Sequence, residues 1–301
     1  MPVTLPIPIL DAPRMLRQSA LATFLCCALA APEAGAADHG RLQATGGLVT
    51  IEAAAGGGLV PWAVMGGLST RPGRDAVLGA STTRVGDFRL DSIGLSASWD
   101  DRLELSLGRQ QFTVDRGLLP AGIDRRIGQT VLGAKLRVAG DLIYGDLPQM
   151  AVGLHYKHSD SDVLATALGA RRNDDVEAYF SVTRLFLAGP FDRNWLLNGT
   201  LRATRANETG LLGFGRVGDD AYDLVGEVSA AMFFSPEFAL GAEYRQKPEG
   251  LPGLGESDWR DVFVAWVPNR HFSLALAWVD LGTIAARPDQ DGVFVSMTGN
   301  W

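Results

Sequence analysis

Apolar and polar residues alternate in segments of ten to thirteen residues that recur from about residue 59 to the end of the chain. In one such segment Leu103, Leu105 and Leu107 alternate with Glu104 and Ser106. Successive side chains of a β-strand point to opposite faces, so each segment predicts a strand with one apolar and one polar face. The segments are also long enough for a tilted strand to cross a bilayer. This pattern favours a sheet that meets lipid on one side.

The alternating segments predict twelve strands, and the connections between them sort by length. We expect the strands at residues 59–70, 87–99, 101–113, 129–140, 148–158, 176–188, 194–206, 222–234, 236–246, 258–268, 270–281 and 291–301. Short connections alternate with long, polar, glycine-rich ones that begin with residues 71–86. Short periplasmic turns and longer outer loops are typical of a transmembrane β-barrel. A soluble β-sandwich has no reason to sort its loops in this way. The expected fold is therefore an all-β, antiparallel transmembrane barrel of about 12 strands.

The last predicted strand ends on an aromatic residue. Val293, Val295, Met297 and Trp301 share one face of the strand, and the polar residues share the other. A final strand that ends in Phe or Trp resembles the C-terminal signal by which bacterial outer-membrane barrels are handed to their insertion machinery. We therefore expect Trp301 to act as an insertion signal. The expected partners are that machinery, outer-membrane lipid and lipopolysaccharide.

The N-terminal region has the features of a secretory signal peptide. Arg14 and Arg17 precede a short apolar run at residues 20–31, and Ala34 to Ala36 supply small residues for cleavage. The run is shorter than the roughly twenty residues that a membrane helix needs. Met1 or Met15 is the start. We expect a signal peptide at 1–36, a glycine- and alanine-rich periplasmic lead-in or small plug at 37–58, and the barrel at 59–301.

Cysteine usage and charge exclude several classes of function. Cys26 and Cys27 are the two cysteines of the sequence, and both lie in the predicted signal peptide. The remaining chain therefore contains no disulfide or thiolate site. Its formal charge is −7, which speaks against nucleic acid as a partner. Aromatic residues near the strand ends favour girdles at the two membrane interfaces, namely Trp62, Phe112, Tyr156, Trp195, Phe234, Phe238, Tyr244, Trp259, Trp266, Phe272, Trp278 and Trp301.

Several motifs resemble a bacterial family that is known as domain of unknown function 3034. They include Ala44 to Gly47, Ile51 to Trp62, Leu201 to Asn207, Gly210 to Gly215, Gly241 to Arg245, Asp261 to Trp266 and Val279 to Gly282. The resemblance covers essentially the whole chain after the predicted signal. It implies an outer-membrane protein, and it supplies no catalytic residues. Trp301 departs from the family's commoner terminal Phe.

Three motifs suggest chemistry, and none of them carries a strong prediction. Residues 213–218 fit the G-x-G-x-x-G pattern, but they lie in a predicted loop without a following helix. His155 and His158 are three residues apart on a strand, so they face opposite sides and cannot share a metal. Ser159 adjoins His158, whereas a catalytic pair needs the two groups within hydrogen-bond reach. We expect no catalytic residues, no cofactor and no metal, with a lipid-hydrolysing barrel as a remote alternative.

Charges of both signs lie on the polar face of the predicted strands. The candidate lumen-lining residues are Glu104, Lys135, Arg137, Lys157, Glu177, Arg202, Asp223, Glu227, Glu243 and Arg245. They either line a narrow water-filled pore, where rings of charge set selectivity, or pair with one another and fill the lumen. The first hypothesis is a narrow passive channel for small solutes. The alternative is a non-conducting structural or binding barrel whose outer loops contact lipopolysaccharide or an external ligand.

Overall fold

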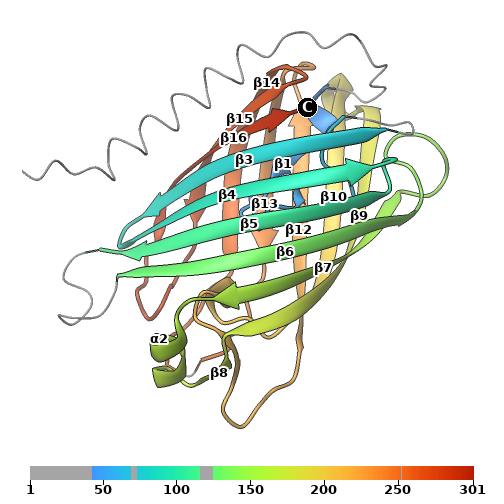
Figure 1. Ribbon diagram of the computed structural model, residues 1–301. Helices are drawn as coiled ribbons and strands as arrows, with labels where there is room; N and C mark the ends of the chain where they lie inside the picture. The colour runs from blue at the N-terminus through green and yellow to red at the C-terminus, as the bar shows by residue number, and fades with distance from the viewer. Residues whose placement is uncertain (1–42, 69–72, 116–124, 252) are drawn as a thin grey trace, which may run out of the picture. The chain divides into compact units, whose positions relative to one another are not determined.

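The computed structural model describes residues 43–68, 73–115, 125–251 and 253–301. The predicted signal peptide at 1–36 lies outside the described residues. Twelve antiparallel strands form a closed barrel (Figure 1). They are β3 (Arg74–Val85), β4 (Phe88–Trp99), β5 (Leu103–Val114), β6 (Arg126–Ala139), β7 (Gln149–Ser159), β9 (Asp174–Gly189), β10 (Arg193–Thr204), β12 (Asp223–Phe233), β13 (Phe238–Arg245), β14 (Trp259–Asn269), β15 (Phe272–Asp280) and β16 (Asp291–Asn300). The predicted fold class is confirmed.

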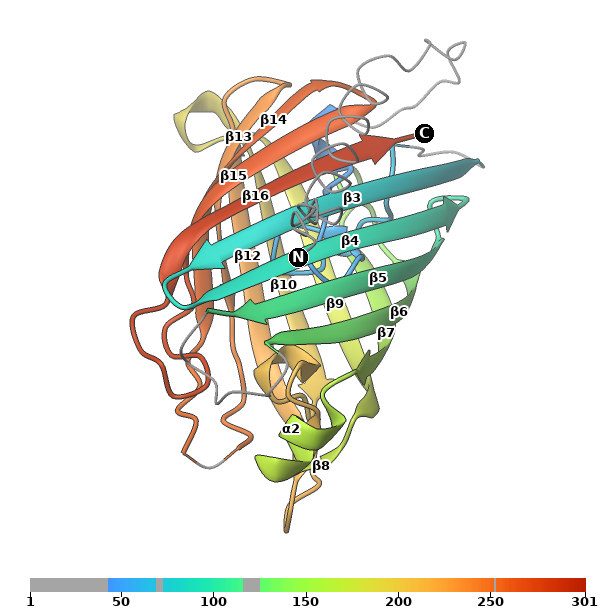
Figure 2. The ribbon, with the colours of Figure 1, turned by 60° about the vertical axis from the view of Figure 1, so that its left-hand side comes forward.

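The barrel closes where its last strand pairs with its first. β16 is antiparallel to β3, and the ladder runs from Gly292 opposite Val85 to Asn300 opposite Val77 (Figure 2). Trp301 extends this ladder, because its backbone exchanges hydrogen bonds of 2.8 and 2.9 Å with Ala76. A closed ladder leaves no strand edge unpaired, which lipid requires because it offers the backbone no hydrogen bonds.

The position of the first barrel strand differs from the prediction. Residues 59–70 were expected to form it, but 59–68 lie inside the barrel, and the first strand is Arg74–Val85. The barrel therefore begins at residue 74 and not at 59. Two physical reasons explain the error. Residues 59–68 are apolar because they contact the wall on several sides, whereas β3 faces lipid with small residues such as Ala76 and Ala80, which give a weak alternation.

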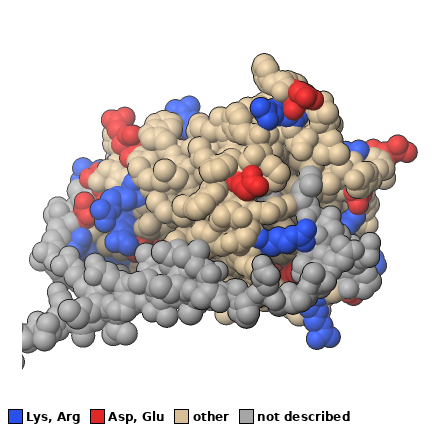
Figure 3. Space-filling model, turned by 90° about the horizontal axis from the view of Figure 1, so that it is seen from above, with Lys and Arg blue, Asp and Glu red and all other residues tan. Residues whose placement is uncertain are grey.

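The two faces of the wall have opposite polarity. Large apolar side chains point outward, as Leu105, Leu197 and Leu276 show with exposed fractions of 46%, 45% and 55%. Polar residues of the other parity point inward and are buried. Figure 3 shows a broad stretch of the outer surface with few charged side chains. This inversion of a soluble fold is what a bilayer-spanning barrel requires.

Most of the aromatic residues named from the sequence lie outside the barrel, as a girdle requires. Tyr156, Phe238, Trp266, Trp278 and Trp301 are at least 40% exposed. The prediction was wrong for four others, which are buried inside: Trp62, Phe112, Trp259 and Phe272. Whether an aromatic side chain faces lipid or the barrel interior depends on its place in the alternation along the strand, and not on its distance from the strand end.

The connections define two different rims. The short-turn rim carries 100–102, 140–148, 190–192 (η2, Pro190–Asp192), 234–237 and 270–271. The described residues of the long-loop rim include 160–173, 205–222, 246–251, 253–258 and 281–290, which contain α2 (Asp162–Ala167), β8 (Ala170–Arg172), η3 (Glu208–Gly210) and β11 (Phe214–Arg216). One connection at the long-loop rim breaks the expected alternation, because β3 and β4 are joined only by Gly86 and Asp87. None of the helices in the described part of the chain has the length and hydropathy of a membrane span.

Candidate functional site

Residues 43–68, called here the interior segment, lie within the barrel and form little regular structure. They contain η1 (Gln43–Thr45) and two short paired strands, β1 (Leu48–Val49) and β2 (Ala55–Gly56). Buried backbone groups outside regular structure need other partners, and polar side chains of the wall supply them. The carbonyl of Pro61 accepts hydrogen bonds from Thr200 at 2.8 Å and Ser181 at 3.2 Å. The carbonyl of Ile51 accepts one from Gln110 at 2.7 Å.

A row of three glycines on the wall lets the interior segment pack closely against it. Gly79, Gly94 and Gly108 are paired across β3, β4 and β5. A Cβ atom built on Gly79 would lie 2.4 Å from the Cβ atom of Val49, and one built on Gly94 would lie 2.6 Å from that of Ala53. These distances are too short for any side chain, so glycine permits the close approach. The wall is therefore shaped for this segment.

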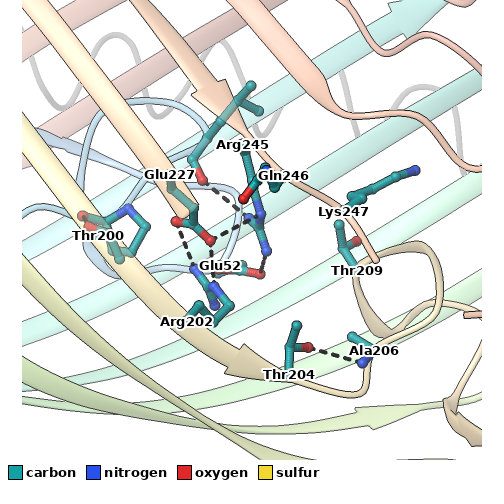
Figure 4. Close-up of polar contacts among 12 residues, drawn as sticks. Glu52, Thr200, Arg202, Thr204, Ala206, Thr209, Glu227, Arg245, Gln246 and Lys247 are labelled. Carbon is teal, nitrogen blue, oxygen red and sulfur yellow. Dashed lines mark hydrogen bonds and ion pairs between the residues drawn. The ribbon is translucent and has the colours of Figure 1, made fainter. Parts of the chain in front are cut away.

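Glu52 lies on a turn of the interior segment and is the centre of a buried ion-pair network (Figure 4). Its Oε1 atom is 2.6 Å from Lys157 Nζ and 2.6 Å from an Arg245 guanidinium nitrogen. Its Oε2 atom is 3.1 Å from Arg202 and 3.6 Å from His155 Nδ1. Three strands, β7, β10 and β13, thus bring their charged side chains to a single carboxylate.

Two carboxylates of the wall complete the network. Glu177 is 2.8 Å from both Lys157 and Arg202, and Glu227 is 2.6 Å from Arg202 Nε. The three cations of the network, including Arg245, therefore face three carboxylates. Burial without such pairing would be costly.

The pKa of Glu52 reflects this environment. Burial raises it, but the positive charges of Arg202, Arg245 and Lys157 outweigh burial and hold the pKa well below its usual range. Glu52 is therefore ionised at neutral pH. Glu52, His155 and Glu177 could each offer a metal ligand within a 4.8 Å cluster. The cations already neutralise these groups, and a divalent ion would have to displace Lys157 or Arg202.

Two further interior carboxylates bind the backbone of the same segment. Glu243 accepts hydrogen bonds of 2.7 Å from the amides of Gly58 and Leu59. Glu104 accepts one of 2.7 Å from the Gly66 amide and forms an ion pair of 3.2 Å with Lys135. The segment is thus held by charged wall residues at three places.

The loop at 205–216 enters the barrel from the opposite, long-loop rim. Its carbonyls bind the wall, because Lys157 donates to Thr209 at 3.1 Å and Ser159 to Leu211 at 2.7 Å. Glu208, Thr209 and Gly210 all have positive φ, a backbone conformation that is strained in the first two. The strain persists because wall contacts fix the loop.

The interior segment and this loop fill the barrel from its two ends. The cavity beside the interior segment has a volume of about 30 Å³, and the cavity beside the loop about 10 Å³. Spaces of this size hold a water molecule or two. At these two places the interior segment and the loop therefore pack closely against the wall.

Comparison with known proteins places the chain in a family. The family model described as "Protein of unknown function (DUF3034)" matches residues 45–298. The chain belongs to this family. The match begins in the interior segment and ends in β16, so DUF3034 includes both the barrel and its filling. The predicted resemblance is confirmed, and no curated protein sequence matches the chain.

Solved structures with a similar arrangement are outer-membrane barrels. The KdgM porin is 9% identical, with a TM-score of 0.47 over 74% of this chain and 98% of the porin. The NanC porin is 9% identical, with a TM-score of 0.45 over 75% of this chain and 98% of that chain. The COG4313 outer membrane channel from Pseudomonas putida F1 is 10% identical, with a TM-score of 0.40 over 76% of this chain and 95% of the channel. Likenesses this distant carry no argument about activity. The apolar outer face and polar interior of its own closed barrel assign this DUF3034 protein to the bacterial outer membrane.

The structure brings eight of the ten candidate lumen residues together inside the barrel. They are at most 3% exposed: Glu104, Lys135, Lys157, Glu177, Arg202, Glu227, Glu243 and Arg245. Arg137 instead lies at the short-turn rim and pairs with Asp101, and Asp223 is exposed at the long-loop rim. Glu52 is not among the residues predicted from the sequence. A lone acidic residue within a glycine- and alanine-rich stretch was the available signal.

The histidine, serine and glycine motifs noted in the sequence do not form a shared site in the structure. Ser159 is buried and bonded to Ser161 and Leu211, whereas His158 points to the outer face. The two side chains therefore form no catalytic pair in this structure. Residues 213–216 belong to the loop that enters the barrel and contain β11, whereas Val217 is exposed. Among the described residues the next element after β11 is the strand β12 and not a helix.

Proposed function

We propose that this protein is a passive outer-membrane channel for small solutes that is closed at rest by its own interior segment. One observation carries the proposal: the segment is attached to the wall through a polar network centred on Glu52. A permanent filling would be at least as stable with apolar contacts, because replacing a buried ion pair by well-packed apolar residues often leaves the folding free energy unchanged or improves it. Polar contacts can be exchanged for water when the segment moves.

The wall supports the same proposal. Its inward face carries ionised and hydroxylated side chains along β7, β9 and β10, which suit a water-filled lumen. Barrels of eight strands are filled by side chains, whereas those of sixteen leave an aqueous channel. Twelve strands lie between these cases, and here a separate piece of chain takes up the space. With that piece and the loop at 205–216 both displaced, the wall would enclose a polar passage.

Single-channel recording in planar bilayers tests the proposal. We expect rare, brief openings from the full chain and steady conductance from a variant that lacks residues 43–68 and in which a short glycine-serine linker replaces the loop at 205–216. Folding of each variant is checked by β-sheet circular dichroism and by heat-modifiable gel mobility. A folded deletion variant without conductance above the lipid background would contradict the proposal. It would favour the alternative of a non-conducting barrel that binds through its outer loops.

A reversible lock provides a second, independent measurement. Residues 28–301 contain no cysteine, so an engineered pair is free of competitors. A Cβ atom on Gly108 would lie 3.0 Å from that of Ala53, close to the roughly 3.8 Å of a disulfide. In Ala53→Cys/Gly108→Cys we expect oxidation to abolish the brief openings and reduction to restore them. Each single-cysteine variant is the control, and openings that persist in the oxidised pair would count against the proposal.

A further inference from the structure

We infer that the wall site that holds Glu52 is a binding site for the carboxylate of a small organic anion, for which Glu52 is the built-in competitor. The inference rests on the proposed function and names its solute class. The juxtaposition that carries it is the convergence of Lys157, Arg202 and Arg245 on the two oxygens of one carboxylate.

The cations of this site belong to the wall and not to the segment they hold. Lys157 lies on β7, Arg202 on β10 and Arg245 on β13, so the barrel fixes their positions. Arg202 is further held by Glu227 at 2.6 Å and by its position over the Tyr179 ring, 5.5 Å from the centroid. These contacts do not involve the interior segment. The cations therefore stay preorganised when Glu52 leaves.

Charge balance shows what the empty site would require. With Glu52 in place, three cations face three carboxylates. Without it, Lys157, Arg202 and Arg245 face only Glu177 and Glu227, and one positive charge is left unpaired among buried groups. Because an unpaired buried charge is costly, the site favours a replacement anion. The cations approach two separate oxygen positions from different directions. This arrangement matches the two oxygens of a carboxylate better than it matches a spherical ion, since arginine binds carboxylates through directed N–H groups.

The alternative occupants are less well matched. A divalent metal would meet three cations around the same carboxylates. Two other interior carboxylates, Glu243 and Asp261, lie directly opposite each other on β13 and β14. They place further titratable carboxyl groups elsewhere in the lumen, so bulk ion selectivity is a poor measure of this site. Binding of a carboxylate at the site itself is the decisive quantity.

Chemical rescue tests the site in the full-length chain. Glu52→Ala removes the built-in carboxylate and leaves space beside the cations. We expect sodium acetate to raise the thermal midpoint of this variant by about 4 °C more than sodium chloride of equal ionic strength. The wild type should show no such difference. Equal effects of acetate and chloride on Glu52→Ala would overturn the inference.

A second substitution locates the rescue. Adding Arg245→Gln should weaken the acetate effect about tenfold in concentration, a factor that corresponds to about 1.4 kcal/mol. Arg245 is chosen because Glu227 keeps Arg202 as its partner. The control is Arg137→Gln, a cation at the short-turn rim that pairs with Asp101 and should leave the rescue unchanged. Equal loss in both double variants would contradict a specific site.

Recording from the variant that lacks both residues 43–68 and the loop at 205–216 separates this inference from the proposed function. We expect gluconate to block its current at concentrations where neutral sorbitol, of similar size, does not. Conductance without gluconate block and without acetate rescue refutes the carboxylate site while the channel stands. Acetate rescue in a barrel that never conducts supports the site and refutes the channel.

Discussion

Replacement of Glu52 by glutamine tests the central physical argument, because it removes one charge with almost no change in shape. The carboxylate receives Lys157 and Arg245 at 2.6 Å and Arg202 at 3.1 Å. Removing one partner from a buried ion pair costs about 3–5 kcal/mol. The glutamine carbonyl keeps one contact, and water can enter a loosened lumen. We therefore expect the lower value, about 3 kcal/mol, which is roughly a hundredfold change in the folding equilibrium.

The assay is urea unfolding in detergent micelles, followed by tryptophan fluorescence and by gel mobility. Trp62 reports on the interior segment, since it is buried and donates to Ser229 at 3.0 Å. The control is Glu249→Gln on an exposed loop position, where a change within about 0.5 kcal/mol is expected. If Glu52→Gln is as mild as this control, the network does not hold the segment, and the reasoning behind the closed channel fails.

The same variant has a defined pH dependence. The pKa of Glu52 is lowered in the folded protein, so its contribution to the unfolding free energy is present above the ordinary glutamate value of 4.5. The contribution is lost as pH falls towards the folded value. The difference between wild type and Glu52→Gln should therefore be full at pH 7 and shrink below about pH 4.5. A difference that grows on acidification would contradict the assigned charge state.

Three other predictions concern the glycine row on the wall, the loop that contains Glu256 and the lipid-facing surface. Gly94→Val should destabilise the interior segment by about 1–3 kcal/mol through overpacking, and proteolysis of the segment measures this effect. The control Gly199→Val should be neutral, because no heavy atom lies within 4 Å of a Cβ atom built at that position. Burial, with the charge of Glu208, raises the pKa of Glu256 to about 8. The unfolding free energy should therefore fall as the pH rises from 4.5 to 8, and Glu256→Gln should remove this pH dependence in urea titrations. Leu276→Arg on the lipid face should cost about 2–4 kcal/mol in bilayer refolding near the midplane, and a neutral result would contradict the barrel's orientation.

Eleven of the twelve strands and the sidedness of the wall followed from local sequence, and the reason is geometric. Period-two alternation is a property of each strand alone, and a bilayer enforces it on every strand. Leu105 and Leu197 could therefore be assigned to the outside, and Lys135 and Arg202 to the inside, before any pairing was known. Eight candidate lumen residues were found by parity alone.

The first strand and the central carboxylate could not be found in this way. The segment at 59–68 is apolar and resembles a strand, but its neighbours are wall residues that are distant in sequence. The turn with Glu52 carries no periodic signal, and its role depends on Lys157, Arg202 and Arg245, which lie 105 to 193 residues further along the chain. Parity also says nothing about depth, so Arg137 and Asp223 at the rims could not be told from their buried counterparts.

The sequence by itself determined an antiparallel barrel of about twelve strands with an apolar exterior and a charged interior, because the alternation within each strand reflects the two environments that its faces meet. Only the tertiary structure decided that the interior is occupied by the chain's own N-terminal segment and by one outer loop. Closure of the barrel brings together side chains from β7, β10 and β13, and long-range electrostatics then selects Glu52 as their common partner. That meeting depends on three-dimensional distance, which no pattern of neighbouring residues encodes.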